Sequence, residues 1–219
     1  MGHPDEEEWR QEAALEEWFN ERLTSQAREP VFAYLARHGD AVQERVDLCL
    51  SEAQRLLSAG YAGAALVRSA AGIEIAVKFF ISKPLVLGAF LSDDWAEALT
   101  DRLIGGRSVN TRELLPAILR NWSIDVTTLV LSNGSQLWET IVAAVWDNRN
   151  GYVHAGATIS DRDAAISIEC LEKLLSHVVA PVARNLGFTR EDTGRWSVVL
   201  AQGDRSINPP RTYATDSPL

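Results

Sequence analysis

Two long stretches of helical apolar periodicity, joined by a short turn, most limit the folds open to this chain. Between residues 41 and 58, and again between residues 62 and 81, apolar side chains recur at intervals of three and four residues, the spacing of one helix face. The second stretch is rich in alanine and ends before Pro84, which disfavours helix in the residue that precedes it. The short link from Ala59 to Tyr61 leaves room only for a tight connection. The sequence therefore predicts an antiparallel helical hairpin.

Several further helices are expected after this hairpin. Their approximate ranges are 94–104, 113–122, 136–150 and 160–186. Gly151 is expected to interrupt the third of them, while Ser160 caps the last and Gly187 ends it. Short extended pieces are expected at 126–131 and 196–200, where β-branched and aromatic residues gather. The predicted class is all-α, an antiparallel bundle of four to five helices.

The chain divides into three regions by composition. Residues 1–39 form an acidic N-terminal helical arm, because the first 40 residues hold ten acidic side chains against four arginines. Gly39 is expected to end this arm, and Asp40 to cap the next helix. Residues 40–187 carry the apolar helical pattern of the bundle. Residues 188–219 form a largely irregular C-terminal tail, since their apolar period fades.

Charge and cysteine content narrow the functional classes. A net charge of −9 argues against a broad cationic surface for nucleic acid. Cys49 and Cys170 fall on apolar helix faces, and we expect both to be small buried hydrophobes in a reducing compartment. No secretory signal is recognised, and charged residues interrupt the most apolar stretch. We therefore expect a cytoplasmic protein that does not cross a membrane and that holds no metal, since no His, Cys and carboxylate cluster has ligand spacing.

The residues with the clearest chemical meaning lie at the end of the apolar helical run 136–150. Arg149, Asn150 and His154 form an Arg-Asn-x-x-x-His pattern. RNA self-cleavage needs a base for the 2′-hydroxyl, an acid for the leaving 5′-oxygen and a cation for the charged phosphorus centre. Histidine titrates near neutral pH, and arginine stays charged and can grip two phosphate oxygens. On an unbroken helix the two side chains would diverge by about 140°, so a break at Gly151 is expected to bring them together.

This pattern resembles the HEPN family (higher eukaryotes and prokaryotes nucleotide-binding domain), many of whose members cleave RNA without a metal. The resemblance covers residues 40–187, with a long helical hairpin first and then two helices joined near the signature, and it includes an alanine-rich second helix. It implies that Arg149 and His154 are catalytic and that no cofactor is needed. It also implies substrate-binding roles for Asn150, Tyr152 and Glu74.

One arginine and one histidine per chain make a small catalytic set, so we expect a homodimer that combines two copies. The resemblance further implies a toxin or phage-defence effector, with RNA as substrate and an antitoxin or regulatory protein as partner. HEPN toxins that are silenced by a partner nucleotidyltransferase often carry a tyrosine two residues after the histidine. Gly156 stands at that position here.

Less specific interpretations remain open for the same residues. Arg149 and His154 would complement the dipole of a helix C-terminus, with Asn150 and Gly151 as an ordinary helix stop. Glu74 can pair with Lys78 one turn later. The functional alternative is a non-catalytic HEPN-like helical module that contacts a nucleotide or a protein partner. In that case the acidic arm would hold a basic partner.

Overall fold

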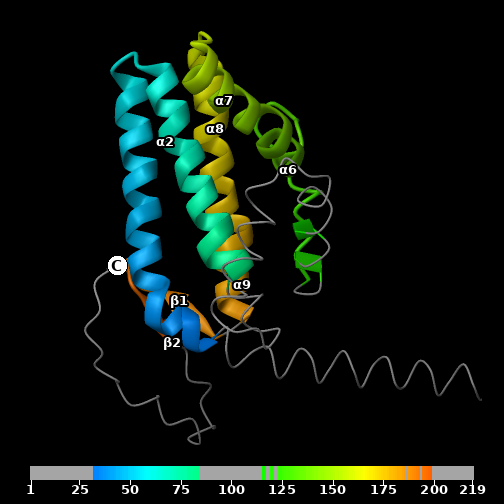
Figure 1. Cartoon of the computed structure of the whole chain (residues 1–219). Coiled ribbons are helices and arrows are strands. Elements are labelled where there is room, and N and C mark those ends of the chain that lie inside the picture. The colour runs from blue at the N-terminus through cyan, green and yellow to red at the C-terminus, as the bar shows by residue number, and fades with distance from the viewer. Residues whose placement is uncertain are drawn as a thin grey trace, which may run out of the picture.

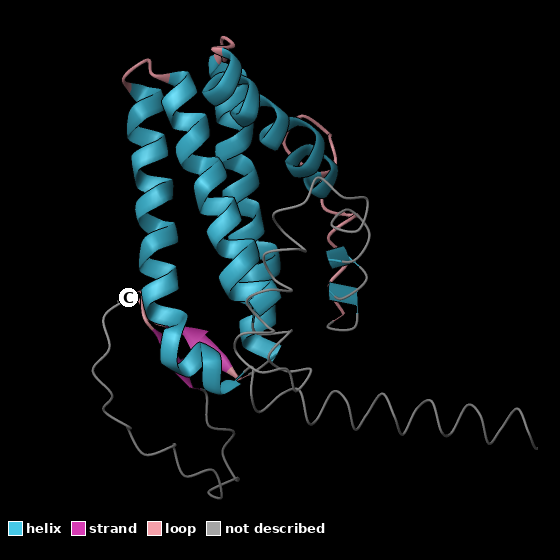
Figure 2. Ribbon diagram, viewed as in Figure 1, coloured by secondary structure: helices cyan, strands magenta, loops and turns pink. Residues whose placement is uncertain are grey.

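Helices make up most of the structure, as the sequence predicts. The computed structural model describes residues 32–83, 115–116, 119–120, 123–185, 187–192 and 194–198. Within these ranges the strands form a small antiparallel pair, and long helices account for the rest of the regular structure (Figure 2). The prediction of a predominantly helical protein is therefore confirmed.

Residues 32–58 form one continuous helix. The prediction that Gly39 ends one helix and Asp40 caps the next is wrong. The Asp40 carboxylate instead accepts a hydrogen bond from the backbone N–H of Trp196, at 2.7 Å. Gly39 is buried, and a Cβ built on it would lie 3.6 Å from the Trp196 ring. Contacts with this distant segment stabilise helix where the local sequence favours a stop. The predicted arm before residue 32 lies outside the described residues.

The predicted helical hairpin is confirmed. A turn at residues 59–61 connects the first helix to α2 (Ala62–Ile75), which continues into the π-helical segment η1 (Ala76–Ser82). Gly60 adopts a φ of 81°, a left-handed conformation that glycine takes without strain. The first helix and α2 run antiparallel and lie side by side (Figure 1).

A second continuous helix leads to the candidate site. It consists of α6 (Leu137–Thr140), the π-helical η2 (Ile141–Val145) and α7 (Trp146–Ala155). Before it, Val130 and Gln136 form an isolated antiparallel bridge around a tight turn. The extended piece expected at 126–131 is thus reduced to one bridging residue.

The last long helix begins and ends as predicted. It consists of α8 (Asp161–Leu174), the π-helical η3 (Leu175–Val179) and α9 (Ala180–Asn185). The Ser160 hydroxyl caps it by accepting a hydrogen bond from the backbone N–H of Asp163, at 3.1 Å. Pro181 lies inside α9, and the wider π turn of η3 directly precedes it, where a regular helix would clash with the proline ring.

Small residues let α2 and α8 lie side by side along their lengths (Figure 1). The hydroxyl oxygens of Ser69 and Ser167 are both fully buried and lie 2.6 Å apart. Ser69 donates to the carbonyl of Leu66, at 3.0 Å, so Ser167 donates to Ser69. Nearby, a Cβ built on Gly72 would lie only 2.6 Å from Cδ2 of Leu171 and 3.1 Å from Cβ of Cys49. Gly72 is therefore a point of close packing among the first helix, α2 and α8.

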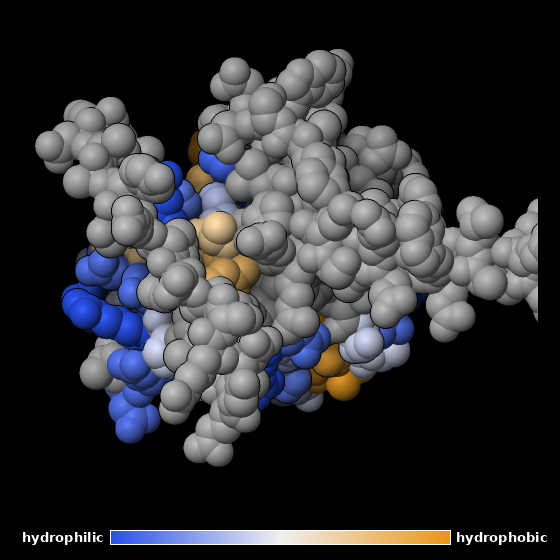
Figure 3. Space-filling model, turned by 90° about the horizontal axis from the view of Figure 1, so that it is seen from below, coloured by the Kyte–Doolittle hydropathy of each residue, from blue (hydrophilic) through white to orange (hydrophobic). Residues whose placement is uncertain are grey.

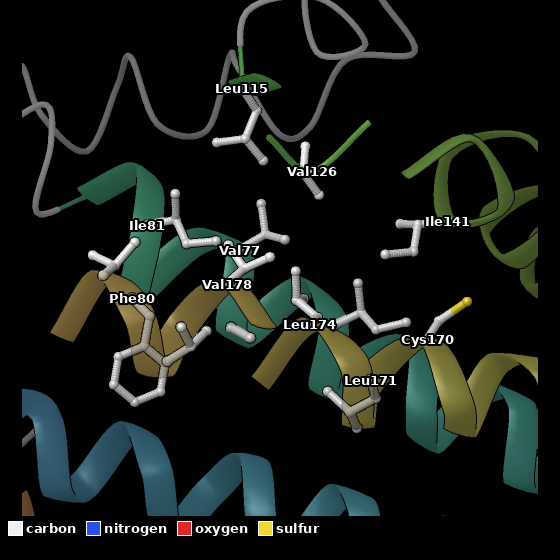
Figure 4. Packing of buried hydrophobic residues seen from close by; sticks show 14 of the residues in the cluster. Val77, Phe80, Ile81, Leu115, Val126, Ile141, Cys170, Leu171, Leu174 and Val178 are labelled. Atoms are coloured by element: carbon white, nitrogen blue, oxygen red, sulfur yellow. The ribbon is translucent and has the colours of Figure 1, made fainter. Parts of the chain in front are cut away.

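Apolar side chains of η1, α8 and η3 face one another in the main core (Figure 4). Residues of η1, among them Val77 and Ile81, point toward Leu174 and Val178. Cys49 and Cys170 are free and buried, as predicted. Burial raises the pKa of the Cys170 thiol to about 12, so it stays protonated at physiological pH.

A short β-hairpin closes one end of the helical body. β1 (Phe188–Arg190) pairs antiparallel with β2 (Trp196–Val198), and β2 falls within the strand predicted at 196–200. The Trp196 ring packs edge-on against Phe80 of η1, with centroids 6.3 Å apart. From this end the described surface is largely hydrophilic, with small hydrophobic areas between (Figure 3).

Other predictions lie outside the described residues. They concern the helix at 94–104, most of the helix at 113–122 and the tail after residue 198. Among the residues that are described, no helix is long and apolar enough to cross a membrane.

The close packing at Gly72 makes a stability prediction. We expect Gly72→Ala to lower the free energy of unfolding by about 1–3 kcal/mol, because the new methyl group overlaps Leu171 in a closely packed core. Urea unfolding followed by circular dichroism measures the change. Gly151→Ala is the matched control, since a Cβ there would meet only the Ala157 side chain, at 3.5 Å. An unchanged midpoint for Gly72→Ala would contradict the prediction.

Candidate functional site

The Arg-Asn-x-x-x-His signature lies within α7, which continues without a break through Gly151 to Ala155. The prediction that Gly151 interrupts this helix is wrong. The helix ends at Gly156, which adopts the left-handed conformation with φ 66°. The carbonyl of Gly151 accepts hydrogen bonds from the backbone N–H groups of Gly156 and of Ala157, the latter at 3.1 Å. The helix stop is thus five residues later than the sequence suggested.

The unbroken helix separates the two predicted catalytic side chains. Five helical positions place Arg149 and His154 about 140° apart around the axis and about 7.5 Å apart along it. The expectation that a break brings them together within one chain is therefore also wrong. Arg149 is partly buried, and its guanidinium donates a hydrogen bond to Oδ1 of Asn150, at 3.1 Å. Arg149 and His154 thus lie on two separate faces of α7.

His154 is exposed in the last turn of α7. In the described part of the chain, its ring has no hydrogen bond or ion pair with another side chain. A protonated histidine at this position would interact favourably with the helix dipole, an effect worth about 0.3–1 kcal/mol. Arg149 lies before the last turn, so this structural interpretation applies to His154 and not to Arg149.

Tyr152 lies against the start of α2. A Cβ built on Gly63 would come within 2.1 Å of Cε2 of the Tyr152 ring, so the ring occupies the space that a side chain at position 63 would need. The Tyr152 side chain nevertheless remains 38% exposed. Tyr152 also lies three residues after Arg149, which places the two side chains on neighbouring positions of one helix face.

Glu74 is not brought to this site within the chain. It lies eleven residues after Gly63 on α2, which corresponds to about 16 Å along the helix axis. Its side chain is partly exposed. The structure therefore groups Arg149, Asn150 and Tyr152 at one helix end and leaves Glu74 farther along α2.

Sequence reasoning missed the apolar character of this end of the molecule. Tyr61 is 63% exposed and Val153 is 49% exposed, and they lie at the same end as Tyr152. The turn at 59–61 and the segment after α7 are seen together at the top of Figure 1. Gly63 was also missed, although a glycine in the first turn of an alanine-rich helix is a signal for close contact.

The surroundings of the site also bear on metal binding. In the ranges the structure describes, no three His, Cys, Asp or Glu side chains are grouped so that they could hold a metal ion.

Gly151 inside α7 and Gly156 directly after it give opposite expectations for substitution by alanine. Gly151→Ala should raise the free energy of unfolding by about 0.5–1 kcal/mol, because the position is helical and has room for a methyl group. Gly156→Ala should lower it by about 1–2 kcal/mol, because alanine is strained at a φ of 66°. Chemical denaturation of both variants measures the difference. A destabilised Gly151→Ala variant would show that the helix does not continue through this position.

Comparison with known proteins leaves the site to be interpreted from its own residues. No protein-family model matches this chain, and neither a curated protein nor a solved structure matches it. The guanidinium of Arg149 is hydrogen-bonded to Asn150, and Tyr152, one helical turn later, packs against Gly63. The exposed His154 lies on another face of the same helix end.

Proposed function

We propose that this protein is a metal-independent endoribonuclease of the HEPN type, with a composite site formed by two copies of the chain. The observation that carries the proposal is the placement of Arg149, Asn150 and His154 on the last turns of an exposed helix. Asn150 holds the guanidinium of Arg149, while the imidazole of His154 is open to solvent. These are the groups that phosphodiester transfer within RNA requires.

The proposed reaction is attack of the RNA 2′-hydroxyl on the adjacent phosphorus. A base removes the proton of the 2′-hydroxyl, the bond from O2′ to phosphorus forms, and the bond from phosphorus to O5′ breaks. An acid returns a proton to the leaving O5′, so the products are a 2′,3′-cyclic phosphate and a 5′-hydroxyl. In the proposal the imidazole of His154 accepts or donates one of these protons, and Arg149 neutralises charge on the phosphate oxygens.

The geometry of α7 favours two copies over one. Because Arg149 and His154 point about 140° apart, one chain presents them to different directions. A two-fold axis near the end of α7 would face Arg149 of one copy toward His154 of the other. Val153, 49% exposed between these two faces, offers apolar surface for such a contact.

We also propose how the helices of this chain are arranged. We infer an antiparallel bundle of four to five helices over residues 40–187, preceded by the acidic arm and followed by an irregular tail. The side-by-side packing of the hairpin with α8 supports it. The buried free thiols of Cys49 and Cys170 suit a cytoplasmic location.

A toxin or phage-defence role, with an antitoxin or regulatory protein as partner, follows from the resemblance. Regulation through a tyrosine two residues after the histidine does not suit this chain. That position is Gly156, whose left-handed backbone ends the helix and disfavours a tyrosine. A regulator would therefore act by another route.

The second candidate is a non-catalytic HEPN-like module that contacts a nucleotide or a protein partner. The unbroken α7 favours it, because a single chain keeps Arg149 and His154 apart. Under this alternative Arg149 would bind a phosphate group, and no bond would be cleaved. The two candidates differ in whether RNA is cut in the presence of a chelator.

We expect RNA cleavage in excess chelator, with 2′,3′-cyclic phosphate ends and no cutting of DNA. Arg149→Ala and His154→Ala should each abolish it, and Asn150→Ala should weaken it less, because an amide positions the guanidinium but transfers no proton. Both inactive variants should melt within a few degrees of the wild type. Trp146→Ala is the stability control, expected to cost about 3 kcal/mol because its ring packs against the core. Cleavage that requires a divalent metal would contradict this mechanism.

A mixing experiment tests the composite site. Arg149→Ala and His154→Ala protein, each inactive, are mixed, allowed to exchange subunits and assayed. If Arg149 of one chain acts with His154 of the other, half of the dimers are mixed and each holds one intact site, so about a quarter of wild-type activity returns. An active wild-type protein that is monomeric by light scattering, and whose variants do not complement, would rule out the dimeric site.

A further inference from the structure

The ring of Tyr152 packs against Gly63 at the surface, and we call this position the seat of the ring. Its edge rests where a Cβ of Gly63 would otherwise be, with the imaginary Cβ 2.1 Å from Cε2 and 2.4 Å from Cζ. Tyr152 as a whole is still 38% exposed, so the residue is partly open to solvent. Tyr61, 63% exposed, lies two residues before Gly63 at the same end. A positioned aromatic ring with an open surface is a suitable platform for another planar group.

The neighbour of this ring is a cation. Arg149 lies one helical turn before Tyr152, so their Cβ atoms are separated by about 5–6 Å. The guanidinium is restrained by its hydrogen bond to Asn150, at 3.1 Å. A restrained cation beside a seated ring matches a nucleotide, in which a charged phosphate adjoins a planar base. One chain therefore offers both contacts without help from His154.

We propose that this site takes single-stranded RNA, with one unpaired base stacked on Tyr152 and the adjoining phosphate on Arg149. The inference rests on the proposed ribonuclease function and adds the residue that would hold a base of its substrate, Tyr152 packed against Gly63. In a duplex the faces of each base are covered by its neighbours, so a protein ring can stack only on a base that is free. The net charge of −9 strengthens the argument, because a polyanion gains little from the protein as a whole and needs a base contact to bind.

Gly63 provides a test that separates the seat from the fold. In Gly63→Ala the new methyl group displaces the far end of the Tyr152 ring, while α2 gains a residue that favours helix. We therefore expect this variant to melt at or above the wild-type temperature and yet to bind RNA less well. A purely structural role for Tyr152 would not lower RNA affinity in a protein of unchanged stability.

The measurement is fluorescence anisotropy in excess chelator, with His154→Ala as the parent protein so that the RNA stays intact. The probes are a short fluorescein-labelled RNA without self-complementarity and the same strand annealed to its complement. The single strand should bind about tenfold tighter than the duplex. Tyr152→Ala and Gly63→Ala should each weaken single-strand binding about tenfold, whereas Tyr152→Phe should bind within about twofold of the parent.

Two controls locate the effect. Leu48→Ala removes an apolar side chain of similar exposure (48%) from the first helix and should leave binding unchanged. Tyr61→Ala removes a more exposed tyrosine that has no glycine seat and should cost less than Tyr152→Ala. Equal binding of duplex and single strand, or parent-like binding by Tyr152→Ala, would overturn the proposal. Displacement of the strand by an equimolar amount of free AMP would assign the seat to a mononucleotide and also overturn it.

The outcomes for the seat and for the proposed function are distinguishable. Single-strand binding that depends on Tyr152, combined with no cleavage by the wild-type protein, would support the seat and remove the ribonuclease. Cleavage in chelator that depends on His154 but ignores Tyr152 and strandedness would support the ribonuclease and remove the seat.

Discussion

The close approach of α2 and α8 is the contact on which the rest of the structure depends. It requires a side-chain-free position at Gly72 and a buried hydroxyl pair, Ser69 with Ser167. Buried hydroxyls are costly unless they are paired, so this pair also fixes how the two helices are aligned. The same helix α2 packs against the first helix at Cys49 and supports Tyr152 of α7 through Gly63. One helix of small residues thus connects the core with the candidate site.

The position at which α7 ends determines the directions in which the signature side chains point. A glycine ends a helix when its backbone turns left-handed, and here Gly156 does so, while Gly151 keeps a helical backbone and supplies a carbonyl to the final turn. The helix therefore carries Arg149 and His154 to different faces. Within one chain the two side chains are therefore not directed at one point in space. Under the proposed ribonuclease function, catalysis at this helix end would require a second copy, whereas phosphate binding would not.

This division gives the two candidate functions a common physical basis. In both proposals Arg149, hydrogen-bonded to Asn150, and Tyr152, packed against Gly63, would contact the nucleotide within one chain. In the ribonuclease proposal, His154 would add proton transfer only where another chain approaches. A HEPN-like binding module and a HEPN-like ribonuclease would then differ in assembly and not in the residues of the chain. Because the net charge is negative, the protein as a whole does not attract a nucleic acid. In either proposal, binding would therefore depend on contacts at this helix end.

Local sequence determined the helical class, the hairpin at 59–61, the Ser160 cap, the stop at Gly187 and the burial of both cysteines, because each depends on periodicity or on a cap formed by adjacent residues. Tertiary contacts decided the rest. Trp196 and its hydrogen bond to Asp40 keep the first helix continuous where Gly39 and Asp40 favour a break, and β1 exists because β2 pairs with it. Gly151 has a helical backbone and Gly156 a left-handed one, a difference that the amino-acid type does not specify. The sequence therefore identified the signature residues, and the fold alone determined that Arg149 and His154 point apart and that Tyr152 rests on Gly63.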